Sequence, residues 1–146
     1  MKKIILTISS AIICLLLLTS IYAQEELRKE GSHYVAEFEK EFKVADDGNL
    51  VIKDVQGDIT IKTWDQQLVK INEVVRMDVY TKTEAEAVVK DMKTRYQQQG
   101  NTITIGAEGS FRSYMQSAYT IQLPKKFNVD VNTRGGDIEV FDLAGR

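Results

Sequence analysis

Two aspartates follow glycines at matching places in the chain, and they are the first candidates for chemistry. Asp58 belongs to the phrase GDITI and Asp137 to the phrase GDIEV. Carboxylates at repeated turns could bind calcium, but calcium β-rolls use a longer glycine-rich repeat, which Gly135-Gly136-Asp137 matches only in part. The interpretation is therefore structural. Gly57 is expected to take a conformation that a Cβ would oppose, and Asp58 to hydrogen-bond the turn backbone. Gly136 and Asp137 are expected to form the corresponding structural turn of the second copy.

Other catalytic and metal-binding patterns are weak in this sequence. His33 is the only histidine, so a Ser/His/Asp site or a zinc site would depend on it alone. Neither a nucleophile-elbow phrase nor a phosphate-binding glycine pattern occurs. The turn at Asp46–Asn49 is much shorter than an EF-hand loop. The sequence predicts no catalytic residue, no cofactor and no metal, so the protein is expected not to be an enzyme.

Four residues with large side chains are candidates for partner contacts. Phe111, Arg112 and Tyr114 lie in the segment GSFRSYMQ, which has no clear periodicity and stands beside glycine. This segment either faces a partner or folds under a sheet. Trp64 either joins a binding face, where aromatic rings contribute large contact areas, or caps the end of a sheet.

The N-terminal residues predict export from a bacterial cell. Two lysines precede an apolar run over residues 4–18, and small residues follow as far as Ala23, which is the pattern of a signal peptide, residues 1–23. The alternative is an uncleaved anchor, although a spanning helix needs about 20 apolar residues. Cleavage before Gln24 removes Cys14, the only cysteine, so the mature chain is expected to have no disulfide. The expected location is the periplasm or the cell surface.

The size and charge of the mature chain limit the classes of partner that are expected for it. About 123 residues remain after cleavage, which is enough for one domain with its own core. The formal charge is −2 for the whole chain and about −4 once two lysines are removed. No block of basic residues occurs, which argues against nucleic acid or an anionic membrane as the main partner.

Apolar residues alternate through most of the mature chain and predict strands. Residues 24–32 are polar and are expected to form a flexible N-terminus, followed by one β domain over residues 33–146. The alternation indicates strands around residues 34–44, 50–52, 59–61, 69–80, 101–107, 114–123, 127–131 and 138–140.

One segment changes to helical spacing. A single apolar stripe is formed by Ala85, Val88, Val89, Met92 and Tyr96. It predicts one amphipathic helix over about residues 83–98 that packs on the sheet. Thr83 with Glu86 fits a capping box at its start, and Gly100 is placed to end it.

A sequence repeat organises these elements. The stretch Asn49–Trp64 occurs again 79 residues later as Asn128–Leu143. Each copy is interpreted as strand, Gly-Asp turn and strand, and the copies are expected to meet as neighbours. The predicted fold is mainly β, a stacked, solenoid-like sheet with one helix. Because such a unit needs a neighbour, either the chain is truncated within a longer array, or its last hairpin exposes an edge for self-association.

The repeated phrases carry a resemblance to a known family. With Trp64 after the first phrase and the Leu123-Pro124 step before the second, residues 50–146 resemble the bacterial adhesin-like family of domains of unknown function. Relatives usually continue through further copies, whereas this chain stops after the second. The resemblance implies an exported or surface-associated β-solenoid-like protein without an established enzyme activity.

The resemblance and the export signal together give two functional expectations. The first is a non-catalytic cell-envelope or surface protein that presents its sheet to a protein or surface partner. The alternative is a periplasmic sensory or regulatory domain of an envelope-stress system.

Overall fold

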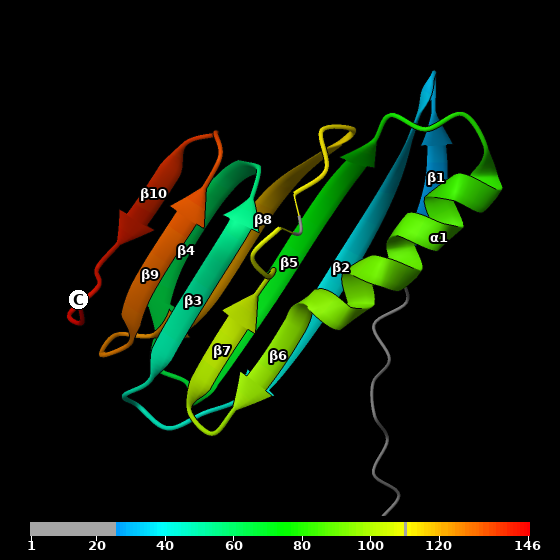
Figure 1. Ribbon diagram of the computed structural model, residues 1–146. Coiled ribbons are helices and arrows are strands. Elements are labelled where there is room, and N and C mark those ends of the chain that lie inside the picture. Colours follow the sequence, from blue (N-terminus) through cyan, green and yellow to red (C-terminus); the bar gives the residue numbers. More distant parts are fainter. Residues whose placement is uncertain (1–25, 110) are drawn as a thin grey trace, which may run out of the picture.

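The computed structural model describes residues 26–109 and 111–146. The predicted signal peptide, residues 1–23, lies outside the described residues. The described part contains ten strands and one α-helix, arranged as two facing sheets with the helix beside the smaller one (Figure 1). The prediction of a mainly β fold with one helix is confirmed.

Both sheets are mixed. The larger sheet has, in spatial order, β1 (Glu26–Glu30), β2 (His33–Lys43), β5 (Leu68–Met77), β8 (Met115–Pro124), β4 (Gly57–Trp64) and β10 (Ile138–Phe141). The smaller sheet has, in order, β6 (Tyr96–Gln99), β7 (Thr102–Ile105), β3 (Asn49–Val55) and β9 (Asn128–Thr133). Strands β3 and β4 pair in parallel with both of their neighbours, whereas all other pairs are antiparallel.

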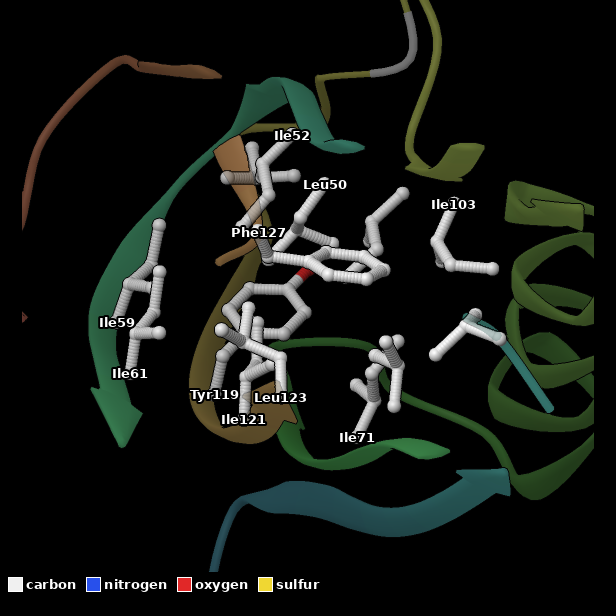
Figure 2. Close-up of a cluster of buried hydrophobic side chains, with 14 residues drawn as sticks. Leu50, Ile52, Ile59, Ile61, Ile71, Ile103, Tyr119, Ile121, Leu123 and Phe127 are labelled. Carbon is white, nitrogen blue, oxygen red and sulfur yellow. The ribbon is translucent and has the colours of Figure 1, made fainter. Parts of the chain in front are cut away.

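The main core lies between the two sheets. Alternate residues of each strand point inward, so Leu50 and Ile52 of β3 face Ile59 and Ile61 of β4 (Figure 2). These four side chains are completely buried. Burying one such aliphatic side chain contributes about 1.5–3 kcal/mol relative to leaving it in water. The inward residues therefore fix which face of each strand points to the core.

The helix is shorter than predicted. Helix α1 covers Lys82–Met92, a 3₁₀ turn covers Lys93–Arg95, and the chain then enters β6 at Tyr96. The predicted end near residue 98 is wrong because residues 96–99 pair with β7 around Gly100, which has φ +58° and forms the hairpin turn. Pairing with a neighbouring strand outweighs the helical spacing of Tyr96.

The helix also begins earlier than predicted. The capping box is formed by Thr81 and Glu84, not by Thr83 and Glu86. The Thr81 hydroxyl accepts the Glu84 N–H at 3.2 Å, and the Glu84 carboxylate accepts the Thr81 N–H at 2.9 Å. These bonds from Thr81 lower the pKa of Glu84, because they favour its charged form.

The predicted flexible N-terminus is wrong for residues 26–32. Strand β1 pairs with β2 in antiparallel register, and Gly31, at φ +60°, turns the chain between them. Arg28 bridges the carboxylates of Glu30 and Glu37 at 2.6 Å each. Leu27 packs against the cluster under the helix. Arg28 and Glu30 thus lie on one face of an edge strand, and Leu27 and Lys29 lie on the other.

The two sequence copies lie side by side, as predicted, but neither is a hairpin. Each copy sends its first strand to the smaller sheet and its second strand to the larger one (Figure 1). Asn49 pairs with Asn128 in one sheet, and Ile59 pairs with Ile138 in the other. Each Gly-Asp phrase therefore makes a corner between sheets. The prediction of a hairpin is wrong because the inward residues of both strands are buried in one core between the sheets.

Candidate interaction site

The glycines of the two corners let adjacent backbones pack closely. Gly57 has φ +134°, and a Cβ there would lie 1.5 Å from the carbonyl oxygen of Ser117. Gly136 has φ +105°, and its Cβ would lie 2.2 Å from the carbonyl oxygen of Gly57. The prediction that a Cβ is opposed at Gly57 is confirmed, and the same holds at Gly136. Only glycine allows the three backbones at Ser117, Gly57 and Gly136 to stack.

The two corner aspartates have different surroundings. The Asp58 carboxylate accepts the backbone N–H of Asp137 at 3.0 Å, so it binds the neighbouring corner and not its own turn. Asp137 occupies the same place in the outer copy. Among the described residues, its carboxylate has neither a hydrogen bond nor an ion pair. The first corner thus shows how the second would bind a further strand.

The second copy leaves part of the core uncovered. Its inward apolar residues define what we term the open end: Val129, Val131, Ile138, Val140 and Leu143. Ile138 and Val140 are paired with the buried Ile59 and Ile61 and so face the same side of the sheet. They are nevertheless 45% and 43% exposed. Within the described part of the chain, these exposed apolar side chains are core positions that no neighbour covers.

The backbone of the open end is also partly unpaired. Within the described residues, β10 pairs only with β4, and β9 pairs only with β3. One β9 group is covered, because the Val129 N–H donates to the carbonyl of Arg146 at 2.6 Å. Edge strands with free N–H and C=O groups are templates for the addition of another strand. The open end therefore combines an apolar face with hydrogen-bonding edges.

The four predicted contact residues do not form one surface. Trp64 ends β4, is half-buried, and donates its indole N–H to the carbonyl of Leu68 at 2.8 Å. Arg112 donates to the carbonyls of Gly109 and Phe111 and so shapes its own loop. Tyr114 is 38% exposed. Trp64 lies at the far end of β4 from the corner beside which Phe111 packs.

Phe111 belongs instead to a cluster that ties the outer copy to the inner one. Its ring lies under the Arg134 guanidinium, with 4.9 Å between guanidinium carbon and ring centre, and its N–H donates to Asp54 at 3.3 Å. Arg134 also hydrogen-bonds the Asp54 carboxylate. These bonds, with Arg134 contributing most, lower the pKa of Asp54 below its ordinary value. Phe111 therefore packs on Arg134 and Asp54 at the corner, whereas the predicted alternative was a position under a sheet.

The sequence did not indicate a role for Asp54. Its φ is +51°, which is uncommon for a residue with a side chain, and β3 has a bulge at this position. The only available signal is its type, since aspartate tolerates the left-handed region better than most residues. The bulge holds the carboxylate where it meets both Arg134 and the loop.

A second polar cluster lies inside the molecule. Glu73, which interrupts the apolar face of β5, is 2% exposed and accepts hydrogen bonds from Tyr96 and from Ser117, the latter at 2.5 Å. The Tyr119 hydroxyl is buried and forms no hydrogen bond with the residues that the structure describes. Burial and the nearby Glu73 raise the pKa of both tyrosines above the ordinary range, so they stay neutral.

The cavity beside this polar cluster is small. A cavity of about 10 Å³ lies between Arg95, Ser117 and the loop that carries Phe111. That volume is about the size of one water molecule. In this cluster, hydroxyl groups supply the hydrogen bonds that a buried carboxylate needs.

The described residues form neither a metal-binding cluster nor a membrane-spanning helix. Residues 26–109 and 111–146 bring no three His, Cys, Asp or Glu side chains close enough together to hold a metal ion. In the same part of the chain, no helix has the length and apolar character to span a bilayer.

Comparison with family models, with curated proteins and with solved structures finds no match to this chain. The resemblance to the adhesin-like family therefore stays a prediction from the two Gly-Asp phrases and their order.

Proposed function

We propose that this protein is a non-catalytic, exported interaction protein of the bacterial cell envelope or surface. In this adhesin-like role, the rigid part of the chain presents the open end, and a strand of a partner adds to β9 or β10. The resemblance of residues 50–146 to the adhesin-like family supports the export and the role. The open end supports the mode of binding.

One observation carries the proposal. The second copy pairs with the first in parallel register, yet Ile138 and Val140 keep almost half of their surface exposed. Large apolar side chains that remain exposed, although they share a face with core residues, are typical of an interaction site. The corner geometry supports a solenoid-like interpretation of this part of the chain, in which each added unit covers the one before it.

The test uses site-specific photo-crosslinking in the bacterium that makes the protein. A photoreactive residue replaces Ile138 at the open end or, as a control, Tyr80, which is 93% exposed next to the start of α1. We expect an envelope-fraction chain that begins at Gln24 and forms a discrete crosslinked species from position 138 only. A cytosolic chain that keeps residues 1–23 would contradict export. Equal crosslinking from both positions would contradict the open end as the site.

A further inference from the structure

The open end carries four carboxylates without a counter-ion in the described structure. They are Asp130, Asp137, Glu139 and Asp142. The one arginine of the same copy, Arg134, is already paired with Asp54. The surface that would receive a partner strand is therefore acidic as well as apolar.

The strand already paired with β10 shows what a neighbour contacts there. On the inner face, Ile59 and Ile61 lie beside Ile138 and Val140. On the outer face, the Lys62 ammonium lies 5.9 Å from the ring centre of Phe141. Because both sides of a strand offer the same alternation, a strand on the free side of β10 would meet the same two kinds of side chain.

We infer that the open end selects an extended partner segment in which β-branched apolar residues alternate with lysine or arginine. The apolar residues would cover Ile138 and Val140, and the cations would lie beside Glu139 and Phe141. The Asp137 carboxylate would accept a backbone N–H of the partner, as Asp58 accepts that of Asp137. This inference rests on the proposed function and adds the chemistry of the partner.

A second copy of this chain fits the open end less well. Pairing two β10 strands would bring Glu139 and Asp137 of one copy near the same residues of the other. Like charges opposite each other on neighbouring strands destabilise the pairing. The self-association predicted from the sequence is therefore expected to be weak.

The test measures binding of synthetic peptides to the purified chain by fluorescence anisotropy. The first peptide alternates valine and lysine over about ten residues, the upper range for a strand. A second has glutamate in place of lysine, and a third has the valines and lysines of the first in separate blocks. We expect the alternating lysine peptide to bind at least about tenfold more tightly than either control, which corresponds to about 1.4 kcal/mol.

Two variants separate the inference from the proposed function. Glu139→Lys should reduce the preference for the lysine peptide by about tenfold. Val140→Lys should abolish binding of all peptides, with the melting temperature showing that both variants fold. Equal binding of the lysine and glutamate peptides, lost in Val140→Lys, would overturn the charge selection and leave strand addition intact.

The remaining outcomes are also decisive. Absence of binding by all three peptides would overturn both the inference and the open end as a binding site. Equal binding of the block peptide would show attraction by charge alone and overturn the inference. A stable dimer of the wild-type chain at neutral pH, lost in Val140→Lys, would make the second copy the occupant.

Discussion

The two ends of the molecule differ in whether their apolar core residues are covered. At one end, α1 lies in the layer of the smaller sheet and covers β2 and β5 (Figure 1), so that Met92 and Val75 are buried together. At the open end, β9 and β10 have no covering element in the described residues, and Ile138 and Val140 are half exposed. We term the end that carries α1 the helix end.

The outermost strands of the larger sheet also differ between the two ends. At the helix end, the outermost strand of the larger sheet is β1, with the sequence ELRKE, and Arg28 of this strand is held by two glutamates. At the open end it is β10, with the sequence IEVF. Charged edge strands discourage pairing, whereas exposed apolar edges invite it. The comparison favours β10 over β1 as the edge of the larger sheet to which the proposed partner strand would add.

The largest expected effect tests how tightly each corner is held. Gly57→Ala should destabilise the fold by about 3 kcal/mol or more, since backbone strain and a clash with Ser117 each cost about 1–3 kcal/mol. Gly136→Ala should cost less, because the outer copy can move away from Gly57. Gly135→Ala is the control, since nothing lies within 4 Å of its Cβ position. Urea denaturation measures the free energy of unfolding of all three variants. A larger loss of stability for Gly136→Ala than for Gly57→Ala would contradict this expectation.

A matched pair of valines gives the intermediate effect. Val75 is completely buried at the helix end, whereas Val140 is 43% exposed at the open end. Val75→Ala should cost about 2–3 kcal/mol through lost burial and a cavity, and Val140→Ala less than about 1 kcal/mol. The free energy of unfolding of each variant measures this. Similar losses would show that the open end is covered in the free protein.

The smallest effect is an acid sensitivity of the open end. The pKa of Asp54 is lowered in the folded protein, so its contribution to stability is present above the ordinary carboxyl range near pH 4 and is lost below it. Asp54→Asn keeps a residue that tolerates φ +51° and removes the charge. In hydrogen exchange, corrected for the intrinsic rate at each pH, acid should lower the protection of the β9 and β10 amides in the wild type more than in this variant. Parallel acid responses in the two proteins would argue against an ionic link.

Local patterns predicted most of the elements of this fold. Alternation located the strands around Ile59 and Ile71, and the constant spacing of the two copies predicted that they are neighbours. The corners were mistaken for hairpins because a Gly-Asp phrase suits both. The choice depends on Ser117, whose backbone approaches Gly57 from a distant part of the chain.

The candidate site was less accessible to sequence analysis for the same reason. Ile138 and Val140 have the alternation of buried strand residues, and their exposure depends on what lies beside β10. Phe111 has no periodicity, and its position depends on Asp54 and Arg134, which are distant from it in sequence. In each case the outcome is set by a tertiary neighbour and not by the residue type.

The parallel pairing of the two copies also constrains the order of folding. Strand β4 has both of its partners, β8 and β10, far downstream, so neither side of it can pair until those segments are available. Contacts between such distant segments raise the contact order, which slows folding, because loop-closure entropy is lost before the contacts form. A chain exported from its N-terminus would therefore emerge with the first copy unpaired. Its apolar strands would stay exposed, and prone to aggregation, until the last corner followed.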